Sequence, residues 1–143
     1  MSMKQYYKIK EALDIAREID PRVPKRRSIT RWRSARCLPG PEYYVHDNGR
    51  AGMYSVELII ALVVTTRMNK DADKGFSIYE IAQAYATFRN TGTGPDGIGQ
   101  LTIITPTDEM STDRAYEAFM AYKQVRQEVE ATLRERGLVC NGE

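Results

Sequence analysis

A short basic segment after the first proline constrains this chain more than any other feature. Residues 22–36 hold seven Lys or Arg residues and one Trp, with no Asp or Glu. The basic residues are Arg22, Lys25, Arg26, Arg27, Arg31, Arg33 and Arg36. The whole chain carries a net charge of only +2, so its positive charge is concentrated locally. A helix with so much unpaired positive charge needs an anionic partner, and double-stranded DNA is the commonest one.

The charge is also divided unevenly between the two halves of the chain. Residues 1–70 carry +7 and residues 71–143 carry −5. This division indicates one end that binds nucleic acid and one end with another role. With 143 residues, of which 42% are hydrophobic, the chain is expected to form one small globular domain with a helical appendage.

Cysteine content and hydropathy predict the compartment. Cys37 and Cys140 are too few to imply a disulfide scaffold, and free thiols indicate a reducing cytosol. The N-terminus lacks the apolar segment of a signal peptide. The longest apolar run, Leu58–Val64, is far shorter than the ~20 residues that span a bilayer. We therefore expect a soluble, cytoplasmic protein with no membrane partner.

Apolar spacing and helix breakers predict two helices in the first forty residues. Apolar residues at helical spacing predict a helix over residues 9–19, which the prolines at 21 and 24 end. Ser28 can cap a second helix over residues 29–37. The inward side of this second helix is expected to carry Ile29, Trp32 and Cys37.

A hairpin and two further helices are expected next. Residues 42–46 and 50–54 flank an Asn-Gly turn, which is typical of a β-hairpin. Ser55 caps a third helix over residues 56–69, whose crowded apolar residues imply deep burial. The Ser77–Glu80 segment fits a capping box, which opens a fourth helix that ends near Arg89.

The last third of the chain reads as a linker and one long helix. Residues 91–111 form a Gly-rich linker that includes a short strand-like segment, Leu101–Thr105. Residues 112–137 form an amphipathic helix, and residues 138–143 are a flexible tail. The expected fold is therefore mainly α. It consists of a winged helix-turn-helix over residues 1–90 (helix, helix, hairpin, helix, helix), followed by a long C-terminal amphipathic helix.

Three segments resemble the DNA-binding domain of the MerR family of transcription regulators. Residues 27–33, followed by Leu38-Pro39, resemble the recognition-helix pattern of that family. Residues 52–58 resemble its wing end and third-helix start, and residues 75–81 resemble its G-F-S-L-x-E-I motif. The chain departs from the family pattern at Thr30 and Arg33, and two of its turns are longer. The resemblance implies a distant member of the family that regulates transcription. Its operator sequence cannot be inferred from those of other members.

Each expected DNA contact follows from side-chain chemistry. The N-terminal turn of the second helix would enter the major groove, where the Arg31 guanidinium can bind guanine O6 and N7. Arg26, Arg27 and Ser28 are expected to hold phosphates. The alternative for the whole basic helix is a solvated surface. Trp32 is expected to pack in the core, and the resemblance implies that its polar edge can also point toward the DNA backbone. The complete expected DNA-binding set is Lys25, Arg26, Arg27, Ser28, Thr30, Arg31, Arg33, Tyr43 and Arg50.

The apolar stripe on the last helix is expected to form the interface of a homodimer. Its residues are Ala115, Ala118, Phe119, Tyr122, Val125, Val129 and Leu133. The stripe could fold back on its own domain, but a stripe of this length after a flexible linker favours burial against a second copy. In the resembled family, an antiparallel helical pair joins two DNA-binding domains. We therefore expect a homodimer, with RNA polymerase or another DNA-associated protein as a further candidate partner.

Enzymatic and metal-binding functions have little support in the sequence. His46 is the only histidine, which leaves little for acid–base catalysis or for a metal site. The Gly-rich residues 90–99 lack the Gly-Lys-Ser/Thr ending of a phosphate-binding loop. No catalytic residue, metal or cofactor is expected. Two other readings remain open: an architectural DNA-binding accessory, similar to an excisionase or a terminase small subunit, and a helix-mediated protein-interaction module.

Overall fold

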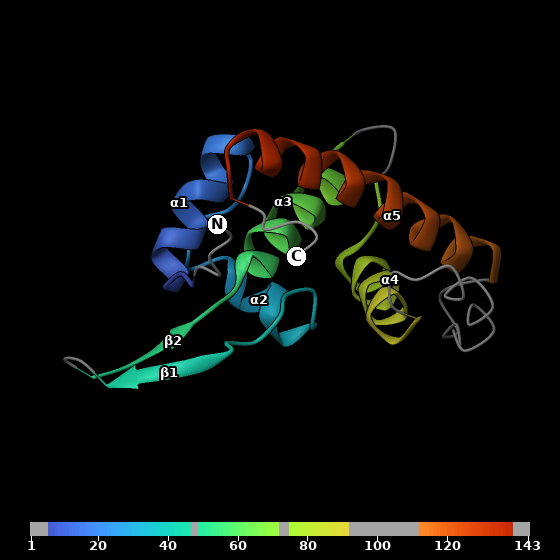
Figure 1. The fold of residues 1–143 in the computed structure, drawn as a ribbon. Coiled ribbons are helices and arrows are strands. Elements are labelled where there is room, and N and C mark those ends of the chain that lie inside the picture. Colours follow the sequence, from blue (N-terminus) through green and yellow to red (C-terminus); the bar gives the residue numbers. More distant parts are fainter. Residues whose placement is uncertain (1–5, 47–48, 72–74, 92–111, 139–143) are drawn as a thin grey trace.

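Five helices and one two-stranded antiparallel sheet make up the described part of the chain (Figure 1). The computed structural model describes residues 6–46, 49–71, 75–91 and 112–138. The elements are α1 (Ile9–Ile19), α2 (Ile29–Ser34), β1 (Tyr43–His46), β2 (Arg50–Met53), α3 (Val56–Lys70), α4 (Ile78–Thr91) and α5 (Thr112–Glu135). The fold is therefore mainly helical, with a small antiparallel sheet between α2 and α3.

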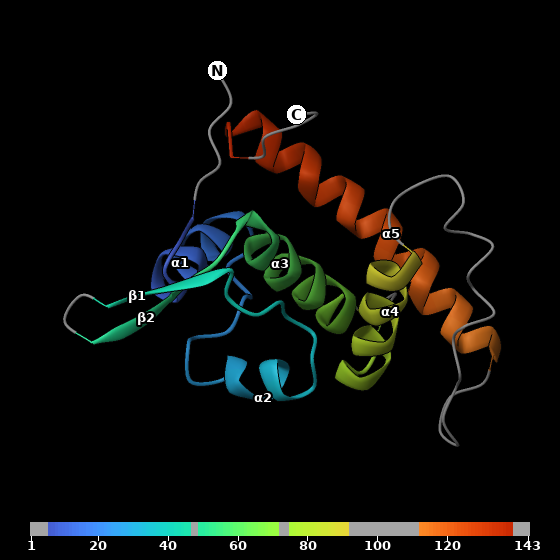
Figure 2. The same cartoon turned by 60° about the horizontal axis from the view of Figure 1, so that its bottom comes forward.

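Helix α3 is the central element of the core. Every residue from Leu58 to Thr66 is buried, because α1, α4 and α5 pack around this helix (Figure 2). The deep burial expected from its crowded apolar residues is confirmed. A helix that is apolar on all sides is stable in water only when its neighbours cover it completely.

Local capping signals fix the starts of α3 and α4. The Ser55 hydroxyl accepts a hydrogen bond from the Glu57 N–H. At the start of α4, the Ser77 N–H donates to Glu80 Oε1 and the Glu80 N–H donates to Ser77 Oγ. Both caps satisfy amides that have no partner inside the helix. These two predictions are confirmed, and the bounds of α1 match the expected residues 9–19.

Helix α2 differs from the expected helix at both ends. Ser28 has helical backbone angles and its side chain makes no capping bond, so its expected role is wrong. The helix ends at Ser34 instead of Cys37 because Arg36 adopts φ +69°. The Cys37 N–H then donates to the Trp32 carbonyl at 2.9 Å, which closes the helix with a left-handed residue. The inward side is confirmed, since Ile29, Trp32 and Cys37 are all buried.

The hairpin has the expected antiparallel pairing, and its base is joined to α1. Tyr44 lies opposite Gly52 and His46 lies opposite Arg50. At the base, Tyr7 and Tyr54 exchange two backbone hydrogen bonds of 2.8 Å. This bridge holds the first residues of α1 beside the end of β2.

The apolar stripe of α5 was expected to form a dimer interface, and the structure corrects this expectation. All seven stripe residues are buried within the chain. They are Ala115, Ala118, Phe119, Tyr122, Val125, Val129 and Leu133. Five of them, Ala118, Tyr122, Val125, Val129 and Leu133, belong to the core cluster where α5 packs across α3 and α4. Either its own domain or a second copy could have covered the stripe, and it is α3 and α4 of the same chain that do so. These residues are therefore core residues and do not present a face to a partner. The same burial removes the support for an interaction module built on this stripe.

Other expectations fall outside the described residues. They concern most of the Gly-rich segment, the strand-like Leu101–Thr105, and Cys140 in the C-terminal tail. Within the described ranges, no helix combines the length and apolar character that crossing a bilayer requires.

Candidate nucleic-acid interface

Helix α2 lies at the edge of the body, on the side away from α5 (Figures 1 and 2). Ile29 and Trp32 anchor it, with exposed fractions of 1% and 6%. Beneath it, the Cys37 thiol is 3.4 Å from the Ile78 carbonyl, to which it donates a weak hydrogen bond. Burial raises the pKa of Cys37 to about 12, so the thiol stays protonated and serves packing. Anchored in this way, α2 turns Thr30, Arg31 and Arg33 toward solvent.

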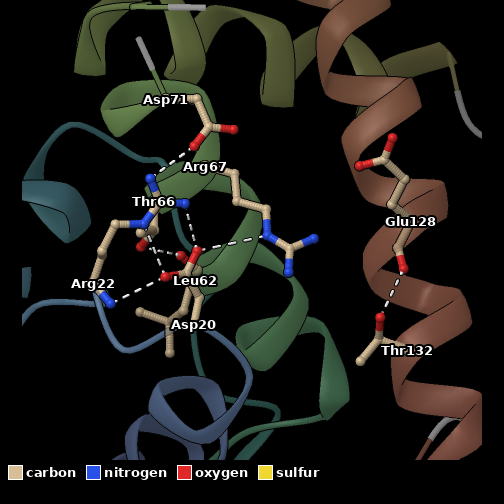
Figure 3. A network of polar contacts seen from close by, with 8 residues as sticks. All are labelled: Asp20, Arg22, Leu62, Thr66, Arg67, Asp71, Glu128 and Thr132. Atoms are coloured by element: carbon tan, nitrogen blue, oxygen red, sulfur yellow. Dashed lines mark hydrogen bonds and ion pairs between the residues drawn. The ribbon is translucent and has the colours of Figure 1, made fainter.

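Arg22 is an exception to the expectation that the basic segment is unpaired. Its Nε and Nη2 donate to the two carboxylate oxygens of Asp20, and its Nη1 donates to Asp71 at 2.7 Å (Figure 3). Arg67 adds a longer contact of 3.6 Å to Asp20. Arg22 therefore joins the end of α1 to the end of α3, and it serves the fold instead of a ligand.

The other six basic residues of the segment keep their charge available. Lys25, Arg26, Arg27, Arg31, Arg33 and Arg36 are all exposed. In the part of the chain that the structure describes, none of the six forms an ion pair with an acidic group. Their charge is not neutralised internally, which is the condition for attracting an anionic partner.

A wide hollow separates α2 from α3 and α4. Its volume is about 970 Å³, and it is bordered by α2, by the last residues of α3 and by the first residues of α4. We call it the α4-side hollow. Its basic residues are Arg27, Arg31 and Lys70, and its hydroxyl residues are Ser28, Thr30, Ser34 and Ser77.

A second hollow, of about 310 Å³, lies between α2, the start of α1 and the hairpin. We call it the wing-side hollow. Its basic residues are Lys8, Lys10, Arg26, Arg33 and Arg50, and they come from three separate segments. The Tyr7–Tyr54 bridge explains why Lys8 and Lys10 lie close to Arg50.

The two faces of the hairpin carry different tyrosines. Strand register places Tyr44, His46 and Arg50 on one face, and Tyr43 on the other. The Arg50 guanidinium lies 3.8 Å from the centre of the Tyr44 ring, and both residues border the wing-side hollow. Tyr43 instead packs edge-on against Tyr6, with ring centres 4.9 Å apart. The structure therefore places Tyr44 beside Arg50. Tyr43, the tyrosine in the expected DNA-binding set, lies on the opposite face of the hairpin.

The structure divides the expected site residues into two groups. Arg26, Arg33 and Arg50 border the wing-side hollow, whereas Arg27, Ser28, Thr30 and Arg31 border the α4-side hollow. Lys25 is exposed just before α2 and borders neither hollow.

Sequence reasoning missed Lys8, Lys10, Lys70 and Tyr44. The two-residue alternation of the strand could have found Tyr44, because it places Tyr44 on the Arg50 face. The lysines lie far from α2 in sequence, so only the packing of α1 and α3 brings them to the hollows.

The chain matches no protein-family model, no curated protein and no solved structure. Among the described residues, no three His, Cys, Asp or Glu side chains come together as a metal ion would require. The site is therefore defined by its own geometry: an anchored short helix with uncompensated arginines, bordered by two basic hollows.

Proposed function

We propose that this chain binds double-stranded DNA in a sequence-specific manner, as a winged helix-turn-helix protein that regulates transcription. One observation carries the proposal: six basic residues around α2 are exposed and have no acidic partner among the described residues. The order helix, helix, hairpin, helix also fits a winged helix-turn-helix. The MerR-like segments of the sequence lie on α2, across the end of β2 and the start of α3, and at the start of α4.

In this proposal α2 enters the major groove and the hairpin lies over the neighbouring backbone. Arg31 is solvent-exposed and can bind the O6 and N7 atoms of guanine with its two terminal nitrogens. Arg26 and Arg27 hold phosphates, which sets the position of α2 without reading the sequence. Trp32 does not contact DNA in this proposal, because it is buried and fixes the position of α2 on the core.

The proposal does not use α5 for dimerisation. The apolar stripe of α5 is buried in the core, so a homodimer on a palindromic site would need another surface. One copy presents both α2 and the hairpin, so a single copy can bind one half-site.

A selection from a random duplex library tests the proposal, followed by titration of the recovered duplex at several salt concentrations. We expect the logarithm of the affinity to fall linearly with the logarithm of the salt concentration, with a slope of about −0.9 for each phosphate contacted. Arg27→Gln/Arg31→Gln should weaken binding, whereas the matched control Lys123→Gln/Arg134→Gln, on α5, should not. If the wild-type chain binds no duplex at ~50 mM salt, the proposal is wrong. Binding without any selected sequence would instead support an architectural role.

A further inference from the structure

We propose that the two hollows beside α2 each hold the phosphate backbone of one DNA strand. The wing-side hollow would take one strand and the α4-side hollow would take the other. This inference rests on the proposed DNA binding, and it adds which strand each basic residue contacts.

The two hollows use different sides of α2. Of these two hollows, Arg26 and Arg33 border the wing-side one, whereas Arg27 and Arg31 border the α4-side one. Among the described residues, no side chain borders both. Four of the six arginines of the segment are thus divided into two sets on different sides of α2, and in this proposal one strand does not contact both sets.

The ridge between these sets carries small polar residues. Thr30 and Ser34 border the α4-side hollow and also a third hollow, of about 450 Å³, that Arg33 shares. Both side chains are exposed. A ridge of short hydroxyl side chains lets base edges come close, so Arg31 can reach a base. Arg27 on one side of the ridge, and Arg26 and Arg33 on the other, then reach outward to the two backbones.

Each hollow is lined by cations and by no carboxylate. The wing-side hollow has five basic residues, from the start of α1, from α2 and the residues before it, and from β2, and none of its bordering residues is Asp or Glu. Lys10 alone of the five pairs with a described carboxylate, that of Asp14 at 3.3 Å. The α4-side hollow has Arg27, Arg31 and Lys70, again without an acidic residue on its border. Both surfaces therefore favour an anion, and three segments contribute to each, which suits a ligand that extends along the protein.

The exposure of these cations favours a nucleic-acid backbone over a small enclosed anion. Lys8, Lys10, Arg26, Arg33 and Arg50 are all exposed. A backbone crossing the wing-side hollow could contact Lys8 and Arg50 together, because the Tyr7–Tyr54 bridge fixes α1 beside β2. The Tyr44 ring holds the Arg50 guanidinium at the edge of this path.

Neutral phosphates, introduced one position at a time, test the assignment. The probe is the duplex recovered by selection, with single methylphosphonates placed along each strand in turn. Lys8→Gln/Arg50→Gln removes two charges from the wing-side hollow, and Arg27→Gln/Lys70→Gln removes two from the α4-side hollow. Lys123→Gln/Arg134→Gln removes the same charge from α5 and is the matched control.

We expect a contacted methylphosphonate to weaken wild-type binding by about fivefold to tenfold. In the wing-side variant, the methylphosphonates of one strand should weaken binding by less than about twofold, while those of the other strand keep their wild-type effect. In the α4-side variant, the two strands should exchange roles. The control should keep the wild-type pattern on both strands. The inference is overturned if both variants lose sensitivity on the same strand, or if either variant loses none. If the selection recovers no duplex, the proposed DNA binding fails and this inference fails with it.

Discussion

Arg126 of α5 and Glu57 of α3 form a bidentate ion pair at the interface of the two helices. The two terminal nitrogens of Arg126 donate to the two oxygens of Glu57, at 2.6 and 2.7 Å. Arg126 also donates to Glu130 on its own helix, and its side chain is almost fully buried. Two other arginines pair with separate helices: Arg114 of α5 with Glu80, and Arg136, the residue after α5, with Glu18. Helix α5 is therefore attached by ion pairs to α1, α3 and α4.

Removing Arg126 should destabilise the fold strongly. Arg126→Ala leaves the Glu57 carboxylate without its bidentate partner at a largely buried position. We expect a loss of about 2–3 kcal/mol, below the full cost of breaking a buried pair, because Glu57 keeps some contact with water. Urea unfolding measures the change. Arg134→Ala, at an exposed position of the same helix, should stay within about 0.5 kcal/mol. Equal losses in the two variants would contradict the role of the ion pair.

The Arg22–Asp20 contact should make stability depend on pH in the acidic range. The Arg22 guanidinium holds the pKa of Asp20 below its ordinary value, although burial acts in the opposite direction. The native state therefore favours the charged carboxylate. Its contribution is complete above the unfolded pKa of about 3.9, and it is lost as the pH falls through the lower folded pKa.

Urea midpoints between pH 7 and pH 3 test this prediction with Asp20→Asn. The variant should be less stable than wild type at pH 7, and the difference should shrink below about pH 4. Asp14→Asn, which removes an exposed carboxylate on α1, should follow the wild-type curve. A constant difference between wild type and Asp20→Asn across this range would contradict the assigned cause.

Arg36 is a position where glycine should stabilise the chain. Arg36 has φ +69° and closes α2, a conformation that glycine adopts without the steric cost of a Cβ. Arg36→Gly should therefore raise the free energy of unfolding by about 0.5–1 kcal/mol. Ser34→Gly, inside α2, should lower it by a similar amount. Chemical denaturation of the two variants compares the signs, and destabilisation by Arg36→Gly would show that its side chain has a compensating contact.

Local signals in the sequence predicted the parts of the fold that depend on neighbouring residues. The Ser77–Glu80 capping box needs only residues three apart, and it forms as expected. The hairpin needs only a turn and two short strands. The end of α2 was missed because an arginine, instead of a glycine, takes the left-handed position.

Features that depend on packing could not be read from the sequence. The α5 stripe has the same spacing whether its own domain or a second copy covers it, and only the position of α3 and α4 decides. Arg22 pairs with Asp71, 49 residues away. Lys8 and Lys70 reach the candidate site by the packing of separate helices, so the two-sided division of charge around α2 is a property of the fold.

Arg31 and Arg27 should differ in their effects on DNA binding, although both border the α4-side hollow. Arg31 lies on the exposed side of α2, where it can reach a base edge, so Arg31→Ala should reduce discrimination at one base pair by about 1–3 kcal/mol. Arg27 precedes the helix and would hold a phosphate, so Arg27→Ala should weaken all sequences alike and reduce the salt slope by about 0.9. Titrations of the selected duplex and of its single-base-pair variants measure both quantities. If Arg27→Ala also changes the base preference, or Arg31→Ala leaves it intact, then the roles assigned to the two arginines are wrong, even where the affinity for duplex DNA is retained.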